Sequence, residues 1–152
     1  CVGEGPFTAE WFGEEAEALR QAGGEYGAST GRPRRVGPID LVATRYGVRI
    51  QGATEVALTK LDVLSYMKEI PICVQYEING QKTDDFPFTA VIDEAKPVFT
   101  TMPGWGCDIS GVRRWEDLPV EARNYVEYVE QAIGCRIRYV SVGAARDEYL
   151  TR

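Results

Sequence analysis

The feature that most limits the fold is an Asn79-Gly80 pair at the end of an alternating segment. Apolar side chains occupy every second position before it: Ile72, Val74, Tyr76 and Ile78. This period is typical of a β-strand with one buried face. Asn-Gly favours a two-residue type I′ hairpin turn, because both central residues of that turn need positive φ. A return strand is predicted over residues 82–88, and Pro87 would confine it to a sheet edge.

Helices and further strands surround this hairpin. Apolar periodicity predicts a helix from Ala9, capped by Thr8 and ended by Gly23-Gly24, and a short helix over residues 62–67. A helix is expected over residues 40–50, with Ile39, Ala43, Tyr46 and Ile50 on one face. The last helix should begin at an Asp117 cap with Pro119 in its first turn and end at Gly134, burying Ala122, Val126, Val129 and Ile133. Apolar runs predict strands over residues 55–58, 98–102 and 137–140. The order predicts an α/β fold with a mixed sheet, flanking helices and a β-hairpin.

Composition narrows the class of protein. The 152 residues, 44% hydrophobic and 26% charged, predict one domain covering residues 1–152. A net charge of −6 argues against a general nucleic-acid binder, and no apolar run reaches the length of a membrane span. The four cysteines are far apart and histidine is absent, so we expect no metal site. Free thiols favour a reducing, cytoplasmic location.

The predicted strand Glu55–Leu58 is followed by Thr59-Lys60-Leu61-Asp62. Polar groups at the carboxyl end of a strand are placed where ligands bind in open α/β sheets. An ionised Asp offers two adjacent acceptor oxygens, which match the N1–H and exocyclic amine of guanine. The Lys stem can lie against the base while its ammonium stays polar. The alternative is a surface Lys–Asp pair after a strand, which four residues alone would favour.

A second stretch combines small residues, hydroxyls and arginines: Gly27-Ala28-Ser29-Thr30-Gly31-Arg32-Pro33-Arg34-Arg35. Its glycines allow the backbone to approach a ligand closely, and arginine forks suit carboxylate or phosphate. The alternative is a solvated basic loop; hydroxyls and glycine directly before clustered arginine favour a binding role. Ser141-Val142-Gly143 follows the last predicted strand and is a weaker signal for ligand contacts. The chain starts at Cys1, which suggests a fragment of a longer protein.

These stretches in this order resemble the carboxyl-terminal part of adenylosuccinate synthetase. The matching motifs are Val2-Gly3-Glu4-Gly5-Pro6-Phe7, the Gly27–Arg35 stretch, Leu58-Thr59-Lys60-Leu61-Asp62-Val63-Leu64, Met102-Pro103-Gly104-Trp105 and Ser141-Val142-Gly143. The resemblance covers nearly the whole chain and implies the carboxyl-terminal portion of a P-loop-NTPase-like fold. It also implies a GTP- and Mg²⁺-dependent ligase of purine biosynthesis that joins IMP and L-aspartate into adenylosuccinate, releasing GDP and phosphate.

The resemblance also implies roles for particular residues. The GTP-binding set is Arg34, Lys60, Leu61, Asp62, Ser141, Val142 and Gly143. The IMP-binding set is Val2 and Arg32. The aspartate-binding set is Ala28, Ser29, Thr30, Gly31, Arg32, Pro33 and Arg34. The complete family enzyme is expected to be a cytoplasmic homodimer.

Two departures from the family pattern matter. Ala144-Ala145 stands where many relatives continue Pro-Asp, which puts the nearby base contacts in doubt. The family's phosphate loop, catalytic base and acid, and Mg²⁺ ligands belong to an amino-terminal half, and no G-x-x-x-x-G-K occurs here. We therefore expect no catalytic and no metal-binding residue in this segment, which should be inactive alone. Two other hypotheses are a stand-alone guanine-nucleotide-binding module and an assembly domain without a ligand.

Overall fold

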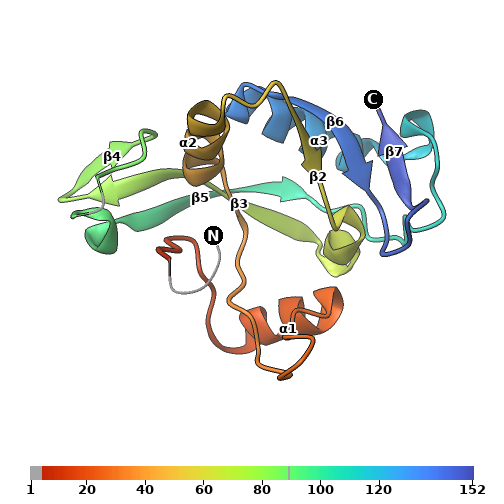
Figure 1. Ribbon diagram of the computed structural model, residues 1–152, viewed down its shortest axis with the longest axis horizontal. Coiled ribbons are helices and arrows are strands. Elements are labelled where there is room, and N and C mark those ends of the chain that lie inside the picture. The colour runs from red at the N-terminus through yellow and green to blue at the C-terminus, as the bar shows by residue number, and fades with distance from the viewer. Residues whose placement is uncertain (1–4, 89) are drawn as a thin grey trace. The chain divides into compact units, whose positions relative to one another are not determined.

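The computed structural model describes residues 5–88 and 90–152 (Figure 1). These residues form two compact units, one drawn from residues before 47 and from 71–100, the other from residues 47–70 and 101–152. Three elements contribute residues to both units: α2 (Leu41–Gln51), β3 (Glu69–Ile78) and β5 (Lys96–Pro103).

The first unit begins with α1 (Gly13–Gly23), which starts four residues later than predicted. The predicted Thr8 cap is wrong, and Phe12 occupies the N-cap instead. The residues before α1 are held by other contacts, because the Trp11 amide donates to the Val36 carbonyl at 2.9 Å. A Cβ on Gly37 would collide with the Ala9 carbonyl, so this stretch packs directly on the neighbouring backbone. The predicted stop is confirmed, since Gly24 caps α1 in the left-handed conformation.

A mixed four-stranded sheet contains the predicted hairpin. β1 (Ile39–Asp40) runs parallel to β3, β4 (Gln81–Thr83) pairs antiparallel with β3, and β5 also pairs with β3. Asn79 and Gly80 have φ of 51° and 77°, which confirms the type I′ turn. The return strand is shorter than predicted. It ends at Thr83, whose hydroxyl accepts from the Asp85 amide at 3.1 Å and turns the chain away.

The apolar face predicted for α2 is not the face that it buries. Leu41 and Val42 in its first turn are buried, whereas Tyr46 and Ile50 are 43% and 69% exposed. Asp40 fixes the start of α2, because its Oδ1 accepts from the Ala43 amide at 3.0 Å. Tyr46 instead stacks on Phe86, with ring centroids 4.6 Å apart.

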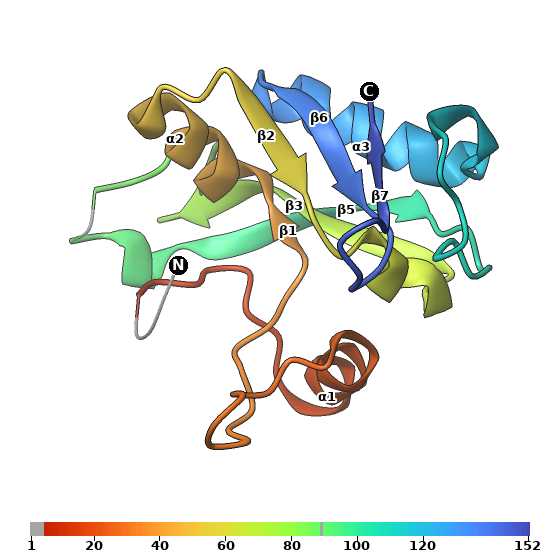
Figure 2. The same ribbon diagram turned by 45° about the vertical axis from the view of Figure 1, so that its right-hand side comes forward.

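The second unit contains a three-stranded sheet. β6 (Arg136–Ser141) lies between β2 (Glu55–Leu58), which is parallel to it, and β7 (Tyr149–Thr151), which is antiparallel. α3 (Val120–Ile133) contacts β6 and covers one face of this sheet (Figure 2). Its predicted buried stripe and its Gly134 stop are confirmed. The predicted Asp117 cap is wrong, because Asp117 binds the Arg114 guanidinium at 2.7 and 2.8 Å.

Short 3₁₀ helices complete both units: η1 (Leu61–Tyr66), η2 (Ile92–Glu94) and η3 (Trp115–Asp117). Trp105 is buried, and its Nε1 donates to the Ser65 hydroxyl at 2.9 Å. The two mixed sheets with flanking helices confirm the predicted α/β class. In the described part of the chain, no helix combines the length and apolarity needed to cross a membrane.

Candidate functional site

The carboxyl ends of β2 and β6 lie side by side in the second unit. Leu58 of β2 is in register with Val140 of β6, and the two strands are parallel. Residues 59–62, which follow β2, and residues 141–143, which end and follow β6, therefore lie at the same end of the sheet, and η1 contacts β6. We call these two segments the β2–β6 edge. Carboxyl edges of parallel strands are where open α/β sheets bind ligands.

Lys60 has an uncommon backbone conformation at this edge. Its φ of 61° and ψ of 37° are left-handed, and it caps η1. Among the described residues other than glycine, only Lys60 and the hairpin Asn79 have positive φ. Such a conformation costs on the order of 1–3 kcal/mol for a residue with a side chain, and it clusters at binding sites. The left-handed conformation therefore marks Lys60 as a candidate binding residue.

Asp62 has a side-chain oxygen at the β2–β6 edge that is unpaired among the described residues. Its Oδ1 is buried and accepts no hydrogen bond in the part of the chain that the structure describes. Only one other described side-chain atom, Arg123 Nε, shares this property. An unpaired buried polar group costs about 1–3 kcal/mol, and more when it is charged. A ligand that brings an N–H donor to Asp62 would remove that cost.

The other half of the β2–β6 edge is a tight turn. The Ser141 hydroxyl donates to the Gly143 carbonyl at 2.9 Å, and the amide of buried Val142 donates to the Glu148 carbonyl at 2.9 Å. The Glu148 carboxylate accepts from the Ala145 amide at 2.7 Å. A Cβ on Gly143 would collide with that carboxylate, so a larger residue there would require the Glu148 side chain to move. Ala144 and Ala145, the departure from the family pattern, are exposed.

The arginine loop, residues 27–35, lies in the first unit and is closed by its own backbone. The Gly27 amide donates to the Arg32 carbonyl, and the Gly31 amide donates to the Gly27 carbonyl, both at 2.8 Å. Gly31 has φ of 65°, which favours glycine. This geometry brings Ala28, Ser29 and Thr30 to an exposed tip.

The three arginines of the loop have different contacts. Arg35 is held in place: it donates to Glu10 at 2.7 Å and to the Gly5 carbonyl at 2.6 Å. Arg34 pairs with Glu25 at 3.0 Å. The exposed Arg32 guanidinium makes no hydrogen bond or ion pair with any described residue. Arg32 and Arg34 can therefore still offer donors to a ligand.

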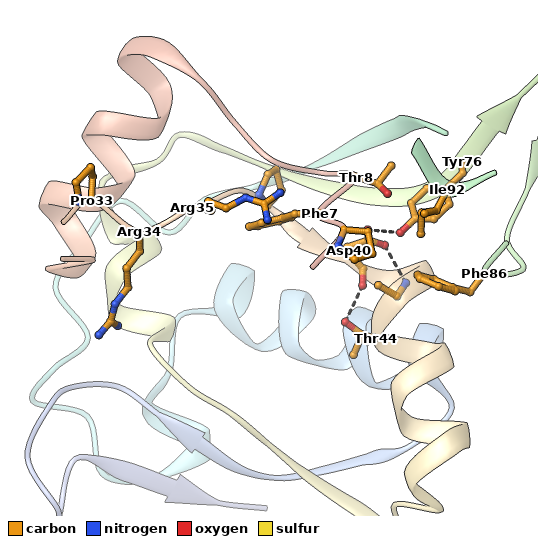
Figure 3. Close-up of a pocket in the computed structure, with 13 residues that line it drawn as sticks. Phe7, Thr8, Pro33, Arg34, Arg35, Asp40, Thr44, Tyr76, Phe86 and Ile92 are labelled. Atoms are coloured by element: carbon orange, nitrogen blue, oxygen red, sulfur yellow. Dashed lines mark hydrogen bonds between the residues drawn. The ribbon is translucent and has the colours of Figure 1, made fainter. Parts of the chain in front are cut away.

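A pocket of about 850 Å³ in the first unit was not anticipated from sequence. Figure 3 shows Asp40 and Tyr76 together in its lining, with Arg35 near Phe7 and Arg34 pointing away from them. The Tyr76 hydroxyl donates to Asp40 Oδ2 at 2.5 Å. Burial, and then the Asp40 carboxylate, raise the pKa of Tyr76 far above its usual range. The same two causes raise the pKa of the Cys73 thiol to about 12.

The Tyr76 hydroxyl therefore keeps its proton at neutral pH and donates a hydrogen bond to the Asp40 carboxylate. Both oxygens of the Asp40 carboxylate are already used, one by Ala43 and one by Tyr76. The pair joins residues 36 positions apart, and only the inward position of Tyr76 in the alternating strand hinted at burial. Its role is structural, since it ties β1, the start of α2 and β3 together.

The expected site residues divide between the units. Lys60, Leu61, Asp62, Ser141, Val142 and Gly143 belong to the second unit, and residues 28–34 belong to the first. Val2, expected near IMP, lies outside the described residues. Among residues 5–88 and 90–152, no group of three or more His, Cys, Asp or Glu side chains is placed to hold a metal ion.

Comparison with known proteins supplies the family. A family model described as adenylosuccinate synthetase matches residues 1–150. The chain is 50% identical to adenylosuccinate synthetases of Bifidobacterium adolescentis, over 98% of its length, and of Geobacter metallireducens, over 99%. It spans 35% of the length of each of these relatives.

A solved structure agrees. The chain superposes on a structure titled as fully ligated adenylosuccinate synthetase from Plasmodium falciparum, with a TM-score of 0.92 and 33% identity. The match covers 99% of this chain and 37% of that one. The chain belongs to the adenylosuccinate synthetase family.

Proposed function

We propose that residues 1–152 are the carboxyl-terminal substrate-recognition domain of an enzyme that uses GTP to join IMP and L-aspartate. The products are adenylosuccinate, GDP and phosphate, on the route to AMP. The relatives' name identifies a ligase, which supports this activity for the complete enzyme. We infer that the complete enzyme is a cytoplasmic homodimer and that this segment alone is inactive.

The observation that carries the proposal is the buried, unpaired Oδ1 of Asp62 at the β2–β6 edge. Guanine presents two adjacent donors, N1–H and the exocyclic amine, to the two oxygens of one carboxylate. The Lys60 stem lies along the base with its ammonium near polar atoms. The turn at Ser141, Val142 and Gly143 supplies backbone groups beside the base, with Leu61 anchoring the edge from the core.

The arginine loop receives the second substrate in this proposal. Arg32 and Arg34 hold the carboxylates of L-aspartate, with the backbone and hydroxyls of residues 28–31 and Pro33 around them. The amine of L-aspartate stays free to attack C6 of IMP, whose 6-oxygen has received a phosphoryl group from GTP, and the C6–O bond breaks as phosphate leaves. Arg32 also approaches IMP, Arg34 also approaches GTP, and the backbone of Val2 contacts the ribose of IMP.

Mg²⁺, which the family implies, does not fit the donor groups of the residues that the structure describes. The carboxylates of these residues form no cluster suited to a metal ion. We therefore assign the metal to the amino-terminal half of the complete enzyme and derive no step through it here.

Exchange of Asp62 for Asn tests the proposal in the complete enzyme. The amide can donate to the 2-oxo group of xanthine but no longer accepts both guanine donors. Asp62→Asn should lower kcat/KM for GTP by the equivalent of about 2–4 kcal/mol. The change removes the charge-assisted hydrogen bonds between the carboxylate and guanine, and it leaves one guanine donor without an acceptor. Xanthosine triphosphate should become the better substrate.

Asp85→Asn is the matched control, because Asp85 is an exposed aspartate after β4. It should leave the preference for GTP unchanged. If Asp62→Asn keeps the wild-type ratio of kcat/KM for the two nucleotides, Asp62 does not recognise guanine.

A further inference from the structure

Arg34 is only partly used by its contacts within the chain. Its NH1 donates to Glu25 Oε2 at 3.0 Å. Its Nε and NH2 make no hydrogen bond with any residue in the described ranges. These two nitrogens form one edge of the guanidinium plane, which is the edge that binds a carboxylate with two parallel hydrogen bonds.

Glu25 holds Arg34 by its backbone as well. The Arg34 amide donates to the Glu25 carbonyl at 2.9 Å, and the neighbouring Tyr26 and Pro33 form an antiparallel bridge. Glu25 and Arg34 therefore face each other across the base of the arginine loop. The carboxylate of Glu25 is the less exposed partner, with its side chain 21% exposed against 55% for Arg34.

Helix α1 supports the same position. Arg20 Nε donates to the Arg34 carbonyl at 2.8 Å, and Arg20 in turn donates to Glu17 at 3.2 Å. Glu17 also accepts from the Tyr26 hydroxyl at 2.8 Å. Hydrogen bonds from Tyr26, Gln21 and Arg20 lower the pKa of Glu17, so it stays ionised at neutral pH. The backbone of Arg34 is thus tied to a helix on one side and to Glu25 on the other.

We propose that Glu25 is a positioning residue that anchors Arg34 through NH1 and so presents its Nε–NH2 edge to a substrate carboxylate. The identity of that substrate as aspartate rests on the proposed function. A carboxylate that pairs with Arg34 can either strengthen or weaken the binding of the substrate carboxylate. A positioning Glu25 strengthens substrate binding, whereas a competing Glu25 would weaken it by occupying the arginine. Contact at NH1 alone, with the bidentate edge left open, favours positioning.

The test is steady-state kinetics of the complete enzyme with aspartate as the varied substrate. Glu25→Ala should raise KM for aspartate about five- to twentyfold, the size expected for losing one charged orienting contact. Glu25→Gln keeps an acceptor without the charge and should raise it about two- to fivefold by the same reasoning. KM for IMP should stay within about twofold, because uniform loss of structure would change both. Glu15→Ala, an exposed glutamate of α1, is the control and should change neither.

A double-mutant cycle with Arg34→Leu separates positioning from general stabilisation. If Glu25 acts through Arg34, Glu25→Gln should have no further effect once Arg34 is leucine. Additive effects, or a KM for aspartate that falls or stays unchanged in both Glu25 variants, would overturn the inference while leaving the proposed function intact. If Arg34→Leu itself leaves KM for aspartate unchanged, the aspartate role of the loop fails instead.

Discussion

The arginines of residues 32–35 are chemically alike but differ in what they already bind. Arg35 spends its donors on Glu10 and the Gly5 carbonyl, and it lies over the Phe7 ring at 5.5 Å. Arg34 is anchored at one nitrogen, and Arg32 has no described partner for its guanidinium. Pro33 fixes φ between Arg32 and Arg34 and limits their relative freedom. Arg32 and Arg34 are therefore the residues whose charge is available to a substrate.

Arg34→Leu in the complete enzyme should raise KM for aspartate about ten- to a hundredfold, the equivalent of a lost charged hydrogen bond of about 1.5–3 kcal/mol. Arg32→Leu should also impair the use of IMP. Arg49→Leu, an exposed arginine of α2, is the matched control. Steady-state kinetics with each substrate varied decides the matter. Unchanged kcat and KM in both loop variants would remove the arginine loop from the active site.

At the scale of single residues, the sequence identified Asp62, Lys60, Arg32 and Arg34 as candidate binding residues. Residue type alone determines which hydrogen-bond donors and acceptors a side chain offers. It did not reveal the left-handed Lys60 or the unpaired Asp62 oxygen, since both depend on how η1 packs against β6. Glu25 was also missed as a partner of Arg34. Nothing in the sequence shows that residues 25 and 34 meet across the base of a loop.

Among the elements, those governed by local signals were predicted well. The Asn79-Gly80 turn, the Gly24 and Gly134 stops and the apolar stripe of α3 all depend on residues within a few positions. Errors arose where distant contacts decide the ends. α1 starts late because the Trp11 amide bonds to the Val36 carbonyl, and the chain just after the Thr83 turn that ends β4 is held by an ion pair between Asp84 and Arg45 at 3.0 Å. In α2, too, the buried residues are Leu41 and Val42 and not Tyr46 and Ile50, although all four are apolar. Apolar spacing within the helix does not determine which of its residues are covered by the rest of the chain.

The stripe of α3 gives a stability test with an internal control. Val126 is fully buried, whereas Val120 in the first turn of the same helix is 52% exposed. Val126→Ala should lower the free energy of unfolding by about 2 kcal/mol, because two buried methyl groups are lost and a cavity is left behind. Val120→Ala should change it by less than about 0.5 kcal/mol. Urea unfolding measures both, and equal losses would show that α3 is not packed through this stripe.

At the scale of the whole molecule, the chain spans about a third of its relatives' length and contains no G-x-x-x-x-G-K phosphate loop, while the proposed function gives it the recognition of the guanine base and of the aspartate carboxylates. The guanine base supplies only part of the affinity for GTP, because the triphosphate carries most of the charge. A part of a ligase should therefore bind GTP weakly when it is alone, and a stand-alone guanine-nucleotide-binding module should bind it tightly. An assembly domain without a ligand should not bind GTP at all. Affinity of the isolated chain for GTP is the quantity on which the three hypotheses differ.

We expect the 152-residue chain alone to bind GTP no more tightly than about 1 mM, or roughly −4 kcal/mol. Titration calorimetry measures this, with circular dichroism to confirm that the isolated chain is folded. Addition of the amino-terminal part of the Bifidobacterium adolescentis relative should bring binding into the micromolar range, because the base and phosphate contacts are then made by one ligand. Asp62→Asn should abolish that gain for GTP and not for xanthosine triphosphate. Micromolar binding by the chain alone would favour the stand-alone module, and no binding even with the added part would favour the assembly domain.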